Sequence, residues 1–169
     1  MTSDYTNVNS KLKEALLYVL QSFEDIEEVG MTKLSKLLYF ADFNYYKENF
    51  EPITGETYIR EDHGPLATEL YDAVEVLKDE GRLFAEKKPI ENNVEKWVFE
   101  VQDSPEFQTL DESEKRTLSE VVSRLGNLSS SELAELSHED NPWQVTEPME
   151  PINYDLVFYR SEEVEEKVE

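Results

Sequence analysis

The residues best suited to chemistry are the chain's two histidines, each close to carboxylates. His63 lies in the sequence EDHGP and His138 in SHEDNPW. Two histidines with an acid could hold a metal ion, and a histidine beside a carboxylate could transfer protons. Neither belongs to an HxxxH pattern, and no third nitrogen or sulfur ligand accompanies them. We expect each histidine to anchor a turn by a hydrogen bond, and a metal-dependent enzyme that uses both is the third of three functional hypotheses.

The sequence shows none of the other common catalytic patterns. No serine or threonine lies in the context of a nucleophile elbow, and no glycine-rich loop could hold a phosphate. The chain has no cysteine, which excludes a disulfide, a thiolate ligand and a thiolate nucleophile. We therefore predict no catalytic residue, no cofactor and no metal, and we expect that the chain is not an enzyme.

The strongest feature of the composition is its acidity. Lys and Arg total 16 against 39 Asp and Glu, which gives a formal net charge of −23. Such a surface repels phosphate backbones, so direct nucleic-acid binding is not expected. Two interpretations stay open. The charge could attract a basic partner, such as a nucleic-acid-binding protein whose groove this chain blocks, or it could suit a salty cytoplasm.

The length and apolar content fit one domain with one core, since 38% of the 169 residues are hydrophobic. No apolar run approaches the roughly 20 residues needed to cross a bilayer. The first residues, MTSDYTNVNSKLKE, lack the charged and apolar regions of a signal peptide. We expect a cytoplasmic protein with a flexible N-terminus over residues 1–9, a single domain over 10–160 and a solvated acidic tail over 161–169.

The central element is predicted to be a helix from Thr32 to Asn49. Its apolar residues recur at helical spacing on one side, and aromatic residues fill a second side. Such a helix is usually buried by several neighbours. Asp42 lies inside this apolar region and would need a hydrogen-bond partner, so we expect a structural pairing. Another amphipathic helix is predicted from Ser10, and residues 57–60 fit a short strand.

The segment after this strand is predicted to continue as a helix and a hairpin. Gly64 and Pro65 are expected to open a helix that Gly81 caps, because proline suits the first helical position. Residues 82–90 and 95–102 predict a β-hairpin, and its Asn-Asn turn tolerates left-handed backbone. The predicted fold class is therefore mainly α with a small β-hairpin (α+β), a compact helical domain with a winged-helix-like hairpin.

The C-terminal third carries two capping boxes. Asp111 with Glu114 and Ser129 with Glu132 each predict a helix start. The second helix is expected to end before Pro142, since the residue before proline leaves the helical region. Residues 153–160 fit either a last helix or a strand.

Two helices followed by a third helix and a hairpin also form the order of a winged helix. The second hypothesis is therefore a winged-helix-type transcription regulator. The outward side chains of the presumed reading helix are mostly acidic, so they cannot approach phosphates or contact guanine as arginine does. The hairpin carries three lysines, which are a weak signal for DNA binding. The outward side chains of the helix are Thr68, Glu69, Asp72, Glu75 and Asp79, and the lysines of the hairpin are Lys87, Lys88 and Lys96.

Three segments, taken in order, resemble a known family. KLSKLLYFADF, then HGPLATELYDAV and later LSHEDNPW are similar to the Panacea domain, also called the SocA-like antitoxin domain. The resemblance runs from about Leu12 to about Phe158 and leaves out the acidic extensions. Its specificity lies in the order and combination of the segments. The matching positions are Lys33, Leu37, Tyr39, Gly64, Pro65, Tyr71, His138, Pro142 and Trp143.

The resemblance implies an α-rich domain encoded beside diverse toxins, which binds and neutralises its toxin. One family member is an adaptor that hands its toxin to a cellular protease, and some relatives occur in mobile elements and prophages. The first hypothesis is therefore an antitoxin-like protein-binding module whose partner is a cognate toxin. The resemblance attaches no catalytic role to the matching residues and does not name the toxin.

Binding a toxin tightly would need a cluster of aromatic or apolar anchors in a cleft. The acidic surface would mainly raise the association rate with a basic toxin. We place the cleft beside the turn at Gly64. The candidate partner-binding residues are Tyr39, Tyr46, Tyr58, His63, Gly64, Pro65, His138 and Trp143.

Overall fold

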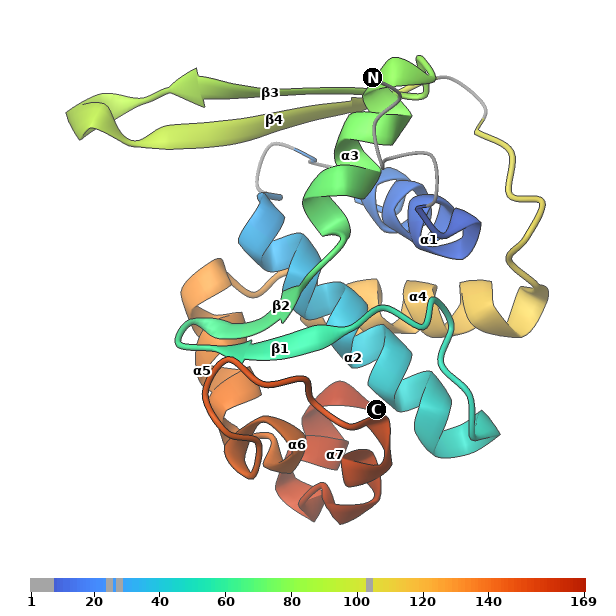
Figure 1. Cartoon of the computed structure of the whole chain (residues 1–169), viewed down its shortest axis with the longest axis vertical. Coiled ribbons are helices and arrows are strands. Elements are labelled where there is room, and N and C mark those ends of the chain that lie inside the picture. Colours follow the sequence, from blue (N-terminus) through green and yellow to red (C-terminus); the bar gives the residue numbers. More distant parts are fainter. Residues whose placement is uncertain (1–7, 24–25, 27–28, 103–104) are drawn as a thin grey trace.

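The computed structural model describes residues 8–23, 26, 29–102 and 105–169 (Figure 1). It is mainly helical with two small antiparallel strand pairs, so the predicted α+β class is confirmed. The predicted flexible N-terminus lies almost wholly outside the described residues, as do residues 103–104. The helices are α1 (Ser10–Gln21), α2 (Met31–Asn49), α3 (Leu70–Asp79), α4 (Glu112–Leu125), α5 (Ser130–Glu139), α6 (Asn141–Gln144) and α7 (Glu162–Val168), with 3₁₀ turns η3 (Glu91–Asn93) and η4 (Tyr154–Tyr159). The strands are β1 (Tyr58–Glu61), β2 (Gly64–Ala67), β3 (Leu83–Pro89) and β4 (Glu95–Val101).

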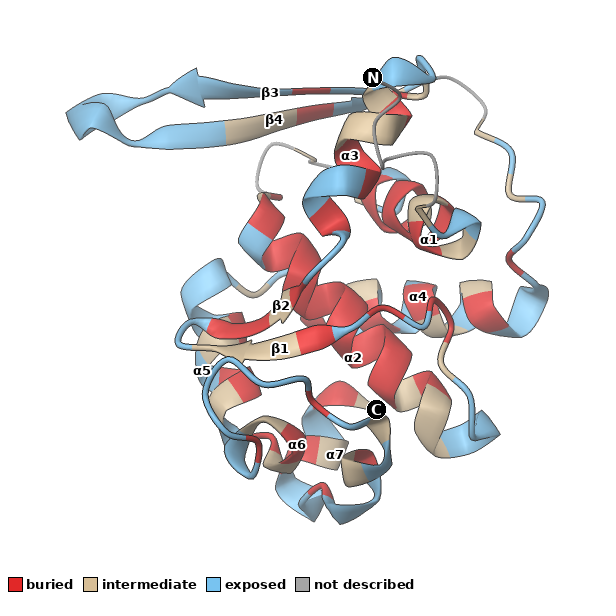
Figure 2. Ribbon diagram, viewed as in Figure 1, coloured by how far each residue is buried: buried red, intermediate tan, exposed pale blue. Residues whose placement is uncertain are grey.

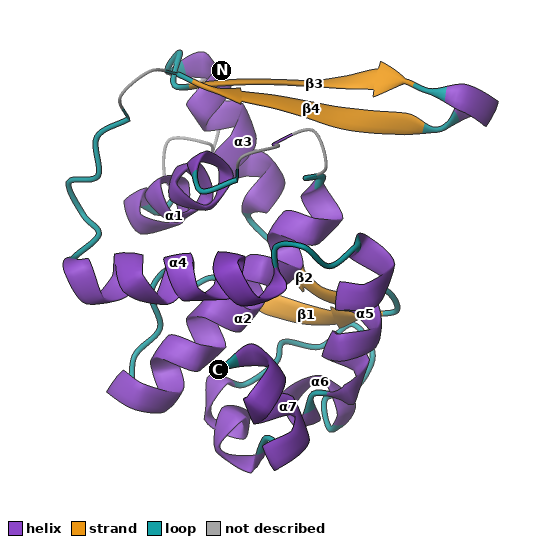
Figure 3. Ribbon diagram, turned by 180° about the vertical axis from the view of Figure 1, so that it is seen from behind, coloured by secondary structure: helices purple, strands orange, loops and turns teal. Residues whose placement is uncertain are grey.

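Helix α2 is the centre of the fold, as its sequence predicts. Figures 1 and 3 show it between the β1–β2 hairpin on one side and α4 on the other. Helices α1 and α5 and the turn η4 pack on its remaining surface. Figure 2 shows buried residues along most of its length. Because so many elements cover it, α2 carries buried residues around its whole circumference rather than along one stripe.

The local signals for helix starts and turns act as the sequence indicates. Both capping boxes are formed at the starts of α4 and α5. The predicted hairpin is β3–β4, in which Leu83 pairs with Val101 and Pro89 with Glu95. At its tip Asn92 and Asn93 have φ of 61° and 62°, the left-handed conformation expected of this turn.

The prediction that Gly64 and Pro65 open a helix is wrong. They begin strand β2, which pairs with β1 from Tyr58↔Ala67 to Glu61↔Gly64. Gly64 has a φ of +116°, which no helix accommodates. The hydroxyl of Ser35 donates to the Pro65 carbonyl at 3.0 Å and accepts from the Ala67 N–H at 2.7 Å, so α2 satisfies the strand's polar groups. The helix begins only at Leu70.

The expectation of a solvated tail over residues 161–169 is also wrong. Residues Glu162–Val168 form α7, which Ser161 caps. Its two valines, Val164 and Val168, are buried, and Lys47 on α2 forms ion pairs with α7 and the last residue of the chain. Residues 161–169 are mostly charged, which suggested a solvated segment. Val164 and Val168, however, lie four residues apart and so share one face of a helix.

The region around Pro142 differs by one residue from the prediction. Asp140, with ψ of 126°, is the non-helical residue that separates α5 from α6, and Asn141 already belongs to α6. Pro142 occupies the first turn of α6, where its missing N–H costs nothing. The open choice for residues 153–160 resolves to the 3₁₀ turn η4, capped by Asn153.

The β3–β4 hairpin projects from the body as an arm (Figure 1). Its root is buried at Leu83, Ala85 and Phe99, where it meets α1 and α3. Its tip is exposed, with Ile90 and Val94 each about half accessible. Within the described ranges, no helix is long and apolar enough to span a membrane.

Candidate partner-binding site

The three sequence segments that resemble the Panacea domain converge on the β1–β2 hairpin. Helix α2 packs against β2, and α5 contacts both β2 and α6. The nitrogen Nε2 of His138 donates to the Asp62 carbonyl at 2.8 Å, and Nε1 of Trp143 donates to the Glu61 carbonyl at 3.2 Å. The guanidinium of Arg60 lies 4.0 Å from the centre of the Trp143 ring. The hairpin tip is therefore held in place by α5 and α6.

Gly64 is required where this hairpin crosses α2. A Cβ atom at this position would lie 2.6 Å from Oγ of Ser137 and 2.8 Å from Cε of Lys36. Both distances are far below van der Waals contact. The glycine therefore serves both its positive φ and the close approach of three segments that are distant in the sequence.

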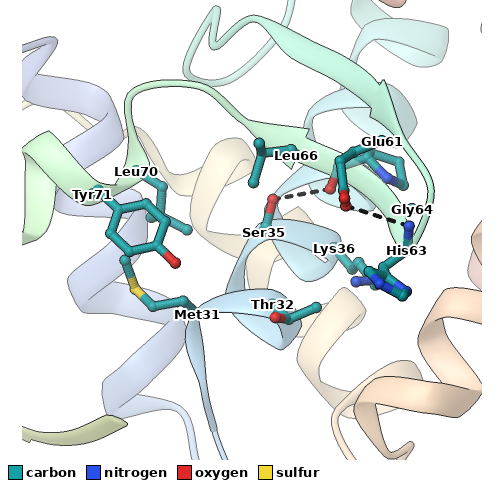
Figure 4. A pocket seen from close by; sticks show the side chains of 11 residues that line it. Met31, Thr32, Ser35, Lys36, Glu61, His63, Gly64, Leu66, Leu70 and Tyr71 are labelled. Carbon is teal, nitrogen blue, oxygen red and sulfur yellow. Dashed lines mark hydrogen bonds between the residues drawn. The ribbon is translucent and has the colours of Figure 1, made fainter. Parts of the chain in front are cut away.

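A cavity of about 140 Å³ opens beside Gly64, between α2, the hairpin tip and the start of α3 (Figure 4). Figure 4 shows Lys36 and His63 side by side at one end and Tyr71 at the other. Its lining combines apolar walls with several polar groups. The lining residues are Met31, Thr32, Ser35, Lys36, Glu61, His63, Gly64, Pro65, Leu66, Leu70 and Tyr71.

Lys36 is the most unusual residue of the cavity. Its side chain is among the largest that are fully buried, with 1% of the residue exposed. Burial lowers its pKa from 10.5 to about 8, while the nearby carboxylate of Glu61 acts in the opposite direction. The ammonium is therefore still mostly protonated at neutral pH.

A second, wider hollow of about 410 Å³ lies under the arm, and we call it the notch. It shares Met31, Thr32 and Tyr71 with the cavity, so the two are adjacent. The rings of Trp97 and Tyr71 meet edge to face at 6.1 Å, and the ammonium of Lys87 lies 5.5 Å from the Trp97 ring centre. The notch residues are Gly30, Met31, Thr32, Tyr71, Lys87, Glu95, Lys96, Trp97 and Ser130.

The predicted partner-binding residues separate into three groups. His63, Gly64 and Pro65 line the cavity, whereas His138 and Trp143 hold the hairpin tip. Tyr39, Tyr46 and Tyr58 do not line the cavity. The predicted set omitted four residues that the structure brings to the site: Thr32, Lys36, Tyr71 and Trp97.

Tyr39 and Tyr58 belong to the core, so the folded domain cannot present them to a partner. The hydroxyl of Tyr39 donates to Asp140 at 2.7 Å, and that of Tyr58 donates to Asp42 at 2.6 Å. Burial and the adjacent carboxylates raise the pKa of both phenols well above the usual value. Tyr46 is half-buried and stacks on Tyr154, away from the cavity.

Asp42 has the structural pairing that its position in the apolar helix predicts. Its carboxylate accepts from the N–H of Thr54 at 2.7 Å, from the Thr54 hydroxyl at 2.6 Å and from Tyr58. Burial raises its pKa, and these hydrogen bonds act against that rise. Asp42 therefore fixes the loop after α2 and is not open to a ligand.

This geometry gives little support to the metal-dependent enzyme or to the winged-helix transcription regulator. Throughout the described part of the chain, no three His, Asp or Glu side chains are grouped as metal ligands. His63 interacts through its backbone N–H, which donates to Glu61 at 3.3 Å. On α3, Asp72 and Asp79 are exposed, so the helix before the arm presents acid to solvent. The likeness of the arm to a wing stays a prediction.

The comparison with protein families decides the relationship. The profile of the family described as antitoxin SocA-like, Panacea domain, matches residues 34–144, about two thirds of the chain. The chain is a member of this family. No curated protein and no solved structure matches it. The matched range of this Panacea domain begins in α2, includes the whole arm and ends in α6, so it contains the lining of the cavity and of the notch except Gly30, Met31 and Thr32.

The signals that the sequence offered for the missed residues were weak. Lys36 is one of two lysines in an otherwise apolar stretch of α2, and a charge in such a stretch indicates either pairing or a function. Tyr71 matches the family pattern, whereas Thr32 and Trp97 carry no comparable signal. The three meet because the arm leaves the body beside the start of α2.

Proposed function

We propose that this Panacea domain neutralises a toxin protein by binding it directly, with the notch and the cavity as the contact surface. Membership in an antitoxin-like family supports a role in a toxin–antitoxin system. The observation that carries the choice of surface is the exposed aromatic lining of the notch. Tyr71 is 49% exposed, and Trp97 is partly exposed beside it. Exposed tyrosine and tryptophan in a hollow are typical anchors of protein interfaces.

The notch is also suited to rigid binding. The β3–β4 arm on one side of the notch has its root in the core. The β1–β2 hairpin on the other side is held by α2, α5 and α6. A surface that needs little ordering loses less free energy on association. The overall charge of −23 would speed the encounter with a basic toxin, while the lysines of the notch would act only at short range.

The test is co-expression with the products of the neighbouring genes, scored by growth rescue and by isolation of a stable complex. We expect one neighbour to be toxic alone and harmless with this chain. The double variant Tyr71→Ala, Trp97→Ala should weaken the complex at least tenfold. The matched control is Tyr159→Ala, because Tyr159 is 70% exposed and lies on η4, outside the notch residues.

Two results would contradict the proposal. One is that no neighbouring product is toxic or bound. The other is that the notch variant and the Tyr159 variant bind the toxin equally well. Measuring the half-life of the toxin in the same cells separates neutralisation by binding from delivery to a protease, because only delivery shortens that half-life.

A further inference from the structure

The side chain of Lys36 is almost wholly buried, with 1% of the residue exposed, and its ammonium keeps a small accessible surface. In the ranges that the structure describes, no group accepts a hydrogen bond from this ammonium or forms an ion pair with it. Its stem passes under Gly64, and the residue lines the cavity. By contrast, the buried charges of Asp42 and of the Arg160–Asp140 pair each have several hydrogen-bond partners. An incompletely compensated buried ammonium favours the binding of an anion.

The surroundings of the cavity add positive potential. Gly30 caps α2 and has no side chain to accept from the first-turn N–H groups, so no N-cap side chain in the described part of the chain balances the positive end of the helix dipole where it meets the notch. Lys87 and Lys96 reach the notch from the arm, and Glu95 adds one negative charge there. In a chain with 39 acidic and 16 basic residues, the notch thus has more lysines than carboxylates.

The shape and the opposing charge restrict the anion. Met31, Pro65, Leu66 and Leu70 give the cavity apolar walls that suit a short aliphatic stem. Glu61 lines the same cavity and would repel a dianion about twice as strongly as a monoanion. Among the described residues that line the cavity there is no arginine to bind a phosphate with two parallel hydrogen bonds. A carboxylate on two methylenes meets these conditions.

We infer that the cavity floored by Lys36 binds the carboxylate of a glutamate side chain, which a partner protein inserts through the notch. The positive charge of Lys36 is thus opposite to the net charge of the chain. A partner would need a glutamate at this one place, which would make the site more selective than the overall charge alone. The identity of the partner as a toxin rests on the proposed function, but the carboxylate site can be tested without it.

The first test uses a capped amino acid as the probe. N-acetyl-glutamic acid N-methylamide is titrated into the protein, and the NMR signals of the lysine Cε groups and of the cavity residues are followed. We expect the probe to shift the signals of Lys36, Thr32 and Tyr71 and to raise the apparent pKa of Lys36 by about one unit, since a bound carboxylate favours the ammonium. The matched neutral probe, the capped glutamine, should do neither.

Two variants and a control locate the site. Lys36→Met keeps an unbranched side chain one atom shorter and removes the charge, so it should abolish binding of the capped glutamate. Glu61→Gln removes the repulsion and should tighten binding severalfold. Lys115→Met, on α4 and paired with Glu112, removes a lysine outside the cavity and should leave binding unchanged.

Three results would overturn the inference. They are equal binding of the capped glutamine, unchanged binding of the capped glutamate by Lys36→Met, and tighter binding of methyl phosphate than of the capped glutamate. The amide signals of the core show in each case whether the variant is folded.

The toxin experiment distinguishes this inference from the proposed function. If Lys36→Met binds and neutralises a neighbouring toxin as well as the natural chain does, the glutamate anchor is refuted while toxin binding stands. If no toxin is bound at all, the proposed function fails, and the capped glutamate still decides whether the cavity is a carboxylate site.

Discussion

Lys36 and Asp140 show two ways in which single residues carry buried charge in this fold. Asp140 accepts hydrogen bonds from Nε and Nη2 of Arg160 at 2.9 and 3.0 Å and from Tyr39, so its charge is balanced inside the core. Lys36 keeps its charge with the carboxylate of Glu61 nearby and, within the described residues, without a hydrogen bond or ion pair. A balanced pair positions helices, whereas an unbalanced charge costs stability. That cost can be measured.

Replacing Lys36 by methionine should stabilise the domain at neutral pH. The lysine has a pKa of about 8 when folded and 10.5 when unfolded, so its cost is complete below pH 8 and disappears as the pH rises towards 10.5. This difference corresponds to roughly 3 kcal/mol. Urea unfolding of both chains at pH 6.5 and pH 10 measures it. A stability difference that does not shrink at pH 10 would contradict the assignment.

Replacing Gly64 by alanine should destabilise the domain by about 2–4 kcal/mol, because the methyl group meets Lys36 and Ser137 and the φ is positive. Gly30→Ala is the control. A Cβ at Gly30 meets nothing within 4 Å, so its effect should stay under about 1 kcal/mol. Equal effects of the two substitutions in urea unfolding would show that the crossing at Gly64 tolerates a side chain.

At the scale of elements, two segments depend on partners far away in the chain. The arm is rooted by β3 and β4 in the core near α1 and α3, and it carries Trp97 over the notch. Helix α7 closes the opposite end of the molecule against α2 and α4. The arm presents a surface to solvent, and α7 completes the core.

Ending the chain after Arg160 should therefore destabilise the domain, although the removed residues 161–169 are mostly charged. Two buried valines are lost, each contributing about 1.5–3 kcal/mol, so the expected loss is about 3–6 kcal/mol. Thermal unfolding measures it. The full-length variant with Val164→Ala and Val168→Ala should lie between the two chains, because it keeps the ion pairs of Lys47. An unchanged melting temperature would mean that α7 adds nothing to the core.

At the scale of the whole molecule, the net charge of −23 sets the response to salt. The ion pairs that the structure describes are mostly at the surface and involve few of the 39 acidic residues. Such pairs contribute little, while the excess charge repels itself. Added salt should thus stabilise the fold.

Raising NaCl from 0.05 to 1 M should increase the melting temperature by several degrees, since screening shortens the range of repulsion from over 10 Å to about 3 Å. KCl should act equally if screening is the cause. A falling melting temperature would show that the surface ion pairs outweigh the repulsion. A strong need for salt would favour a salty cytoplasm as the origin of the acidity, whereas full stability at low salt would favour a basic partner.

The sequence by itself determined the elements whose signals are local. The periodicity of α1 and α2, both capping boxes, the Asn-Asn turn and the pairing of Asp42 all follow from interactions within a few residues or from the cost of burying a polar group. The combination of three segments also identified the family, which the match over residues 34–144 confirms.

Only the tertiary structure decided what depends on contacts between distant segments. Pro65 and Ala67 lie in a strand because Ser35 on α2 bonds their backbone carbonyl and N–H, and residues 162–168 form a helix with buried valines where it packs against α4. The notch exists because Trp97 of the arm lies near the start of α2, and Lys36 is buried because Gly64 lets the hairpin pass over it. No local pattern encodes these approaches, since each depends on how three or more elements pack.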